Sequence, residues 1–140
     1  MKRLAREMVI RAEQTPDAVA VVDEDGSHTI RTAVEAATSL ADVFGGIDPS
    51  PPTVVIQADN TWGTVAAALA VGLAGGVVAV VSPHATESEF ALALEDIRPD
   101  VVVGTSETLR RWGVPDDRFP VEKPVFGPYR VRASNAPFAS

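Results

Sequence analysis

Five side chains that could bind a ligand or a partner follow two apolar runs of the sequence. They are Asp59, Asn60, Trp62, Ser82 and His84. The two runs, Thr53–Ala58 and Val77–Val81, have the composition of buried strands. Open α/β sheets bind ligands at the carboxyl ends of parallel strands. We therefore take these five residues as the candidate site, and assign no catalytic residue, cofactor-binding residue or metal ligand.

The first three of these residues also have a structural interpretation. Asn and Asp are strongly preferred at helix N-caps, which favours Asp59 or Asn60 as the cap of a helix beginning near Trp62. An indole ring buries a large apolar area. Trp62 is therefore favoured as an anchor in the core or at a subdomain interface, rather than as a platform for substrate.

His84 is the only titratable base at either strand end. General-base chemistry needs a hydrogen-bonding partner, and the neighbouring sequence offers none. Thr86 and Glu89 have the spacing of a capping box, so we expect His84 to be a solvent-facing loop residue. A small enzyme built on His84 and Asp59 is disfavoured because it lacks a nucleophile–base–orienter set. The other histidine, His28, lies in an expected hairpin strand and is interpreted as a surface residue.

The glycines of the segment Gly72–Gly76 resemble a nucleotide-binding loop in composition only. A phosphate-binding glycine loop follows a strand and opens a helix, so that the N–H groups of the helix N-terminus face the anion. Here the glycines follow an apolar helical pattern and precede the strand Val77–Val81. The sequence predicts a tight turn from helix to strand.

Composition narrows the class of protein. The chain has 140 residues, a net charge of −7 and no cysteine, which argues against disulfides, a thiolate nucleophile and a cysteine metal site. Nucleic-acid binding needs a cationic surface, and no long basic cluster occurs. The uncharged stretch after Asp59 is interrupted by Gly75 and Gly76, so we expect a buried helix and a buried strand rather than a membrane span. We also expect a cytoplasmic location. Two lysines beside ten arginines suggest a GC-rich bacterial gene.

Hydrophobic spacing predicts an α/β fold. Residues Lys2–Gln14 and Thr32–Phe44 have helical period, with the β-hairpin formed by Ala18–Val22 and His28–Ile30 between them. Apolar strands then alternate with helices, which predicts a small parallel βαβαβ sheet with helices on both faces. The remaining elements are the strands Thr53–Ala58, Val77–Val81 and Asp100–Val103 and the helices Trp62–Ala74, Glu87–Ile97 and Ser106–Trp112, the last with Ser106 as its expected N-cap.

The periodicity ends at Gly113, so we divide the chain into a domain of residues 1–113 and a tail of residues 114–140. The tail is rich in proline, which argues against a helix, and in aromatic residues, which argue against pure disorder. Two alternatives stay open. The tail contains an edge strand around Val125–Val131, or it is an arm that docks on a partner.

Four segments, in this order, resemble the beginning of the adenylate-forming superfamily of acyl-CoA synthetases, peptide-synthetase adenylation domains and luciferases. They are the run Thr15–Val22 with the turn at Asp25-Gly26, the strand Val54–Ala58 leading to Asn60, the helix–glycine–strand run Ala66–Pro83, and the segment Glu89–Val103. The resemblance covers roughly residues 3–113. It implies the N-terminal subdomain of such an enzyme.

The parts of that family that bind ATP do not occur in these 140 residues. Its Ser/Thr/Gly-rich phosphate loop, its Tyr-Gly-Thr-Glu-type segment and its C-terminal catalytic lysine do not occur in this sequence. The resemblance thus implies a non-catalytic N-terminal piece of an AMP-forming acyl-CoA synthetase-like ligase, either a split-enzyme subunit or a truncated relic. ATP and Mg²⁺ would bind only after assembly with a complementary chain. The alternative is a repurposed module that binds a protein, an acyl group or a carrier protein without ligase activity, as a complex or a homo-oligomer.

Overall fold

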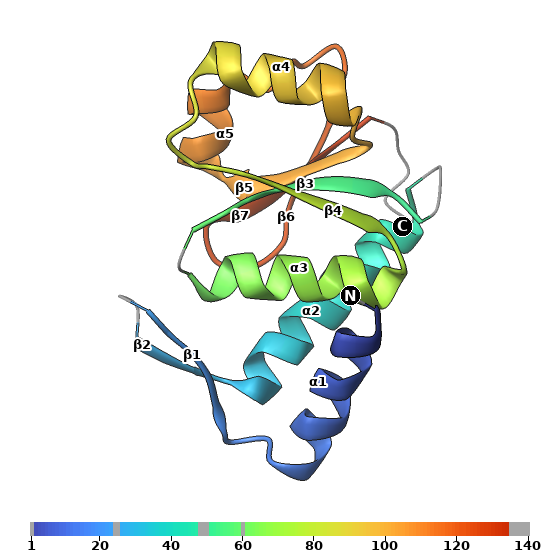
Figure 1. Cartoon of the computed structure of the whole chain (residues 1–140), viewed down its shortest axis with the longest axis vertical. Helices are drawn as coiled ribbons and strands as arrows, with labels where there is room; N and C mark the ends of the chain where they lie inside the picture. The colour runs from blue at the N-terminus through green and yellow to red at the C-terminus, as the bar shows by residue number, and fades with distance from the viewer. Residues whose placement is uncertain (1, 24–25, 48–50, 60, 135–140) are drawn as a thin grey trace.

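A five-stranded mixed sheet forms the centre of the chain, with helices on both faces (Figure 1). The computed structural model describes residues 2–23, 26–47, 51–59 and 61–134. In spatial order the strands are β4 (Val77–Val81), β3 (Thr53–Gln57), β5 (Val101–Thr105), β7 (Tyr129–Ala133) and β6 (Val121–Pro124). The predicted α/β class is confirmed.

The first three strands of the sheet are parallel, as their sequences predict. Val55 in β3, the middle one of these three strands, lies opposite Ala79 of β4 and Val102 of β5. Residues Val54–Ile56 are fully buried. An uninterrupted apolar run is stable here because both faces of the strand are covered and neither meets water.

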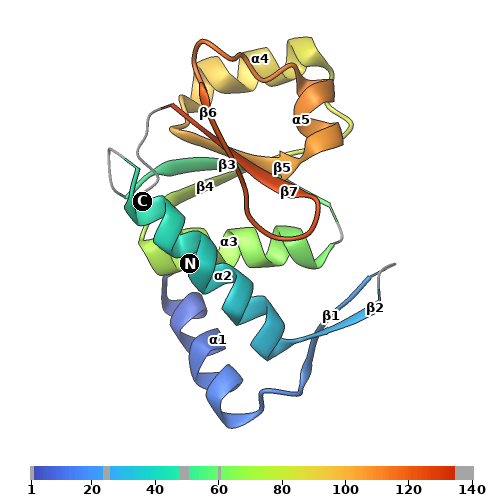
Figure 2. The same cartoon turned by 180° about the vertical axis from the view of Figure 1, so that it is seen from behind.

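Two pairs of helices cover the two faces of the sheet (Figures 1 and 2). They are α2 (Ile30–Gly45) and α3 (Trp62–Ala74) on one face and α4 (Glu87–Ile97) and α5 (Ser106–Trp112) on the other. Side chains alternate along β3, so Val54 and Ile56 join the α2/α3 core while Val55 joins the α4/α5 core. In the second core the rings of Phe90 and Trp112 stack with centroids 4.6 Å apart.

The glycine segment after α3 is a turn and not a phosphate loop. Gly75 adopts φ 76°, in the left-handed region that glycine reaches without strain. Its N–H donates to the carbonyl of Gly72, and the N–H of Gly76 donates to the carbonyl of Val71. This pair of bonds is a Schellman ending of a helix, so the predicted turn is confirmed.

The other helix ends confirm one predicted cap and correct another. Thr86 and Glu89 form the predicted capping box at the start of α4, with both reciprocal bonds present. At the start of α5 the cap is Thr105, whose hydroxyl accepts from the N–H of Thr108, and not Ser106. The strand β5 extends to Thr105 and α5 follows without a linker, which places the capping side chain one residue earlier than expected.

The N-terminal part packs beside this sheet. It consists of α1 (Lys2–Gln14) and a two-stranded sheet of β1 (Val19–Asp23) and β2 (Gly26–Thr29), which leads directly into α2. The hairpin is antiparallel, as predicted. Helix α2 begins two residues before its predicted start because the Thr29 hydroxyl caps it by accepting from the N–H of Thr32.

The proline-rich segment adds two strands to the sheet. A single edge strand around Val125–Val131 is one of the two alternatives that the sequence leaves open, and the structure has the antiparallel hairpin of β6 and β7 in its place. Strand β7 lies inside the sheet, between β5 and β6, and Val131 pairs with Val103. Tyr129, Val131 and Ala133 are buried while Arg130 and Arg132 between them are half-buried, which is strand alternation. Prolines around this short pattern weaken its signal in the sequence.

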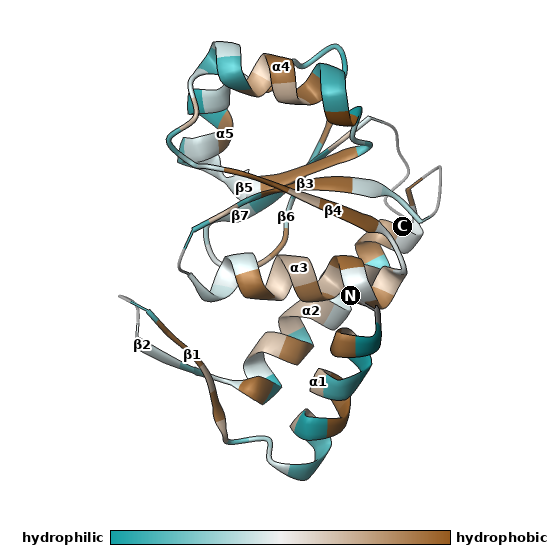
Figure 3. Cartoon of the chain, viewed as in Figure 1, coloured by the Kyte–Doolittle hydropathy of each residue, from teal (hydrophilic) through white to brown (hydrophobic). Residues whose placement is uncertain are grey.

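Hydropathy follows the layers of the fold (Figure 3). The parallel strands β3, β4 and β5 and the helix α3 are mostly apolar, while polar residues gather on the outer faces of α1 and α4. In the part of the chain that the structure describes, no helix is both long and apolar enough to cross a membrane.

Candidate functional site

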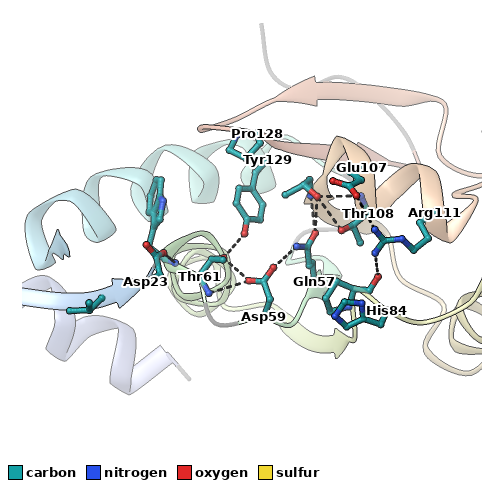
Figure 4. A pocket seen from close by; sticks show the side chains of 14 residues that line it. Asp23, Gln57, Asp59, Thr61, His84, Glu107, Thr108, Arg111, Pro128 and Tyr129 are labelled. Carbon is teal, nitrogen blue, oxygen red and sulfur yellow. Dashed lines mark hydrogen bonds and ion pairs between the residues drawn. The ribbon is translucent and has the colours of Figure 1, made fainter. Parts of the chain in front are cut away.

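An open cleft of 680 Å³ lies at the carboxyl end of the parallel strands (Figure 4). Its walls come from the ends of β1, β3 and β5, the loop after β4, the helices α3 and α5, and the start of β7. Segments that are far apart in the sequence therefore meet around one hollow. Described residues that follow β3, β4 and β5 all line this hollow.

The carboxylate of Asp59 is the centre of a hydrogen-bond network in this cleft. Its Oδ1 accepts from the N–H of Thr61 at 3.2 Å and from the Thr61 hydroxyl at 2.5 Å. The Thr64 hydroxyl lies 2.8 Å from the same oxygen and 2.7 Å from the carbonyl of Gln57. The other oxygen, Oδ2, accepts from the side-chain amide of Gln57. Both oxygens of Asp59 are thus bonded within the chain.

Gln57 joins this network to the neighbouring strand. It is the last residue of β3, and only 5% of it is exposed. While its amide N–H donates to Asp59, its Oε1 accepts from the N–H of Thr105 at 2.9 Å. A buried amide is stable only when its donors and acceptor are satisfied, so Gln57 fixes Asp59 relative to the end of β5.

Two opposing effects act on the pKa of Asp59. Partial burial raises it, and the hydrogen bonds from Thr61, Gln57 and Thr64 lower it. Together the hydrogen bonds outweigh burial, so the pKa lies below the ordinary value of 3.8. Asp59 is therefore ionised at neutral pH, and it is neither a proton donor nor a free base.

Tyr129, at the start of β7, closes the network from above (Figure 4). Its hydroxyl lies 2.5 Å from the Thr61 hydroxyl. Since Thr61 donates its proton to Asp59, the Tyr129 hydroxyl donates to Thr61. Burial raises the pKa of Tyr129, so it keeps that proton. The ring lies against Gly63, where any Cβ would fall inside it.

The start of α3 is capped from the hairpin, which the sequence did not predict. The carboxylate of Asp23, at the end of β1, accepts from the N–H of Trp62 at 2.8 Å. The formal N-cap residue is Thr61, and its side chain makes no capping bond. The predicted capping by Asp59 or Asn60 is thus wrong for Asp59, whose carboxylate faces the network instead. Asn60 lies outside the described residues.

The prediction that His28 is a surface residue is also wrong. Only 15% of its side chain is exposed, and its Nε2 lies 3.0 Å from Asp23 Oδ1. Its ring stacks on Trp62 with centroids 5.0 Å apart, and the ring of Trp62 also contacts that of Phe126, with centroids 5.1 Å apart. Trp62 thus joins the hairpin, α3 and the segment before β7, which is the anchoring role that the sequence favoured.

The loop after β4 contributes less to the site. His84 lines the cleft with an exposed ring, as expected of a loop residue. Ser82 does not line it. Its hydroxyl accepts from the N–H of His84, and its carbonyl accepts from the indole N–H of Trp112. Beside it, Arg111 of α5 donates to the carbonyl of Pro83 and to Glu107. This loop is therefore tied to α5.

Sequence reasoning located the cleft but missed much of its lining. Asp59, Trp62 and His84 lie there. The residues it missed include Asp23, Gln57, Thr61, Thr105, Arg111 and Tyr129. Only Gln57 carried a clear local signal, as a polar residue at the end of an apolar strand.

Acidic side chains predominate in the lining of the cleft. Among the described residues that line it, the carboxylates of Asp23, Asp59 and Glu107 outnumber the one guanidinium, Arg111. No three His, Asp or Glu side chains in the described ranges are grouped so as to hold a metal ion. The arrangement positions backbone segments around a polar hollow.

Comparison with known proteins gives the family. A family model described as "AMP-binding enzyme" matches residues 9–125. The chain belongs to the AMP-binding enzyme family. The matched residues include the N-terminal hairpin and the chain through β6, so one family model covers both the hairpin and most of the central sheet.

Relatives of this AMP-binding chain include parts of large synthases. Bacitracin synthase 2 of Bacillus licheniformis is 34% identical over 103 residues, which are 73% of this chain and 4% of that protein. Polyketide synthase PksN of Bacillus subtilis (strain 168) is 33% identical over 95 residues, or 66% of this chain and 2% of that protein.

Solved structures of AMP-binding relatives have the same fold. The crystal structure of IdnL1 superimposes with a TM-score of 0.76 and 26% identity over 98% of this chain and 28% of that one. A benzoate CoA ligase from Burkholderia xenovorans LB400 gives a TM-score of 0.69 over 76% of this chain and 22% of that one, at 20% identity. The chain thus spans well under a third of these relatives.

Proposed function

We propose that these residues form a non-catalytic N-terminal scaffold of an AMP-forming ligase that resembles acyl-CoA synthetases. ATP-dependent activation of a carboxylate would then need a complementary segment. By this term we mean a protein segment, from the same or a neighbouring reading frame, that carries the Ser/Thr/Gly-rich phosphate loop. Either a split enzyme or a longer chain would supply it.

The bonding of Asp59 is the observation that carries this proposal. Asp59 lies at the carboxyl end of the sheet, and hydrogen bonds from Thr61, Thr64 and Gln57 engage both of its oxygens. A group in this state stabilises the walls of a cleft. It is poorly suited to act as a nucleophile or as a general base.

The charge of the cleft supports the same conclusion. Adenylation concentrates negative charge on the triphosphate and on the phosphoryl group in transfer, and enzymes stabilise that charge with Mg²⁺ and cationic side chains. The described lining has three carboxylates and one arginine, and Arg111 already bonds to Glu107 and Pro83. We therefore expect ATP and Mg²⁺ to bind only with the complementary segment, which would supply the cationic side chains that stabilise the triphosphate.

The test is carboxylate-dependent exchange of pyrophosphate into ATP. We expect no exchange with residues 1–140 alone, and exchange when this chain and the complementary segment are produced together. Exchange by the complementary segment alone, at a rate that this chain leaves unchanged, would rule out the scaffold function. Pyrophosphate exchange by residues 1–140 alone would also rule out the scaffold function.

An interaction module without ligase activity is the second candidate, and the edge of the sheet favours it. Strand β4 has its outer edge unpaired in the described chain, and Val77 and Val80 on it are 62% and 60% exposed. An apolar edge is a natural site for another strand to add. Light scattering coupled to size-exclusion chromatography discriminates, since a strictly monomeric and inert protein would contradict this function.

The compartment and source follow from the same proposal. Bacitracin synthase 2 and polyketide synthase PksN are both from bacilli, and the arginine-rich composition suits a bacterial gene. We place the ligase in the bacterial cytoplasm, where ATP is available.

A further inference from the structure

An apolar groove of 310 Å³ lies on the outer side of α3, where α1 crosses it. We call it the α1–α3 groove, and its lining residues are Leu4, Met8, Thr64, Val65, Ala68 and Leu69. Leu4 is 55% exposed and Val65 is 38% exposed. In Figure 1 the two helices lie together on the side of the sheet away from α4. An apolar surface of this kind commonly marks a site of protein contact.

Helix α3 has the composition of a helix that is covered on all sides. Its thirteen residues include no charged side chain. Helices at a protein surface normally carry a polar face, and a helix that is apolar all round is normally buried. The sheet and α2 cover the inner sides of α3, while Val65 remains in contact with water. The sequence of α3 therefore suits a further layer of protein over this groove.

The other wall of the groove belongs to a basic helix. Helix α1 has four basic residues and two acidic ones, a net charge of +2, in a chain whose net charge is −7. The rest of the chain thus carries −9. Arg11 lies three residues after Met8 and seven after Leu4, so it continues their stripe along the helix, and it is exposed. The groove thus offers an apolar floor with a basic end.

We infer that the α1–α3 groove is the docking site for an amphipathic helix of the complementary segment, with an apolar face and acidic residues along its flank. This inference rests on the proposed function. The apolar face would fill the groove and cover Leu4 and Val65. The acidic flank would pair with Arg11. Since the matched part is 28% of a structure such as IdnL1, most of such an enzyme lies outside these residues and can provide that helix.

The test measures binding of the full chain to the complementary segment by isothermal titration calorimetry, using single substitutions. We expect Leu4→Glu and Val65→Glu each to weaken binding at least tenfold. Leu92→Glu is the matched control because Leu92 is 63% exposed on α4, at the opposite end of the molecule (Figure 1). It should leave the affinity unchanged. Arg11→Glu should weaken binding severalfold at low salt, and the loss should shrink in high salt.

Circular dichroism melts of each variant establish that it is folded before binding is compared. Because Leu4 and Val65 are partly exposed, we expect both variants to fold. If Leu4→Glu, Val65→Glu and Leu92→Glu all bind like the unsubstituted chain, the inference is overturned. If the chain alone dimerises and Val65→Glu makes it monomeric, a second copy occupies the groove and the inference is also overturned.

Pyrophosphate exchange on the same samples separates this inference from the proposed function. If Leu4→Glu and Val65→Glu bind the complementary segment with unchanged affinity and still support exchange, the inference is contradicted and the scaffold function stays intact. Groove-dependent binding without any exchange supports the inference and contradicts the function. Failure of the unsubstituted chain to bind the complementary segment contradicts both.

Discussion

Asp59 shows how a single carboxylate can link the protonation of a side chain to the stability of the fold. Its pKa in the folded chain is below the ordinary value of 3.8 because its hydrogen bonds outweigh the opposing effect of burial. A carboxyl group whose pKa is lowered by folding stabilises the protein above the unfolded pKa. That contribution is lost as the pH falls from about 4 through the folded pKa.

The variant Asp59→Asn tests this at the scale of one residue. The amide has the same shape, but it carries no negative charge and replaces one of the two accepting oxygens with an NH₂ donor. We expect it to lower the free energy of unfolding at pH 7 by about 1–2 kcal/mol, the usual cost of a hydrogen bond to a charged group at a partly exposed site. The difference between the two proteins should shrink below pH 4. Urea denaturation at several pH values measures it, and a difference that grows on acidification would contradict the assignment.

Tyr129 and Gly63 make a second prediction at this scale. Tyr129→Phe removes the bond to Thr61 and keeps the ring, so it should cost about 0.5–1.5 kcal/mol. Gly63→Ala places a methyl group where the ring now lies, so it should cost more, about 1–3 kcal/mol, because the ring must move. Thermal unfolding of the two variants and of the double variant provides the measurement. Additive effects would show that the ring and Gly63 do not share one contact.

At the scale of elements, the hairpin depends on Asp23. Its side chain is only 2% exposed. The carboxylate accepts a hydrogen bond from the N–H of Trp62, at the start of α3, and lies 3.0 Å from His28 Nε2. We expect Asp23→Ala to destabilise the fold by about 1–2 kcal/mol through loss of the cap. It should also release the hairpin, so that the amides of β1 and β2 exchange faster in hydrogen–deuterium exchange.

Asp17→Ala is the matched control for that experiment. Asp17 precedes the hairpin and lies 3.6 Å from Arg31, but its side chain is 85% exposed. Exposed ion pairs contribute little, so stability and exchange should stay within error. Equal effects of the two substitutions would show that the cap on α3 does not hold the hairpin.

Local spacing predicted most of the elements, and long-range bonding explains the rest. The helices at Trp62–Ala74 and Glu87–Ile97 follow from apolar spacing and capping signals within each segment. The cap on Trp62 comes from Asp23, 39 residues earlier, and the bond from Tyr129 to Thr61 spans 68 residues. No pattern in a window of ten or fifteen residues contains either partner. The site was therefore predictable as a place in the fold but not as a set of contacts.

The inner position of β7 has a similar explanation. Its alternation of Tyr129, Val131 and Ala133 with two arginines is a signal of a strand with unlike faces. Such a signal indicates a strand but does not indicate which strands pair with it. The pairing of β7 with β5 depends on the path that the chain takes from α5 back to the sheet. Arg132 supports that return by donating to the carbonyl of Phe119.

At the scale of the whole molecule, β4 leaves an apolar edge in contact with water. Val80 is 60% exposed at that edge. Proteins commonly protect sheet edges with lysine, so Val80→Lys should reduce aggregation at high concentration. It should change the free energy of unfolding by no more than about 0.5 kcal/mol, as for other surface substitutions.

Turbidity and dynamic light scattering measure that change, with Leu92→Lys as the control. Leu92 is 63% exposed, but it lies on a helix and not on a sheet edge. If both lysine variants reduce aggregation equally, the effect is one of net charge and the edge of β4 is not its origin.

The bond between Thr61 and Tyr129 also bears on the order in which the molecule folds. Contacts that are distant in the sequence require large loops to close, and they slow folding more than local ones. The hairpin of β1 and β2 and the individual helices can form early, since their partners are close in the chain. The cleft can close only when β7 has paired with β5 and carried Tyr129 onto Gly63. During synthesis, Asp59 would therefore stay exposed to solvent until β7 has left the ribosome and paired with β5.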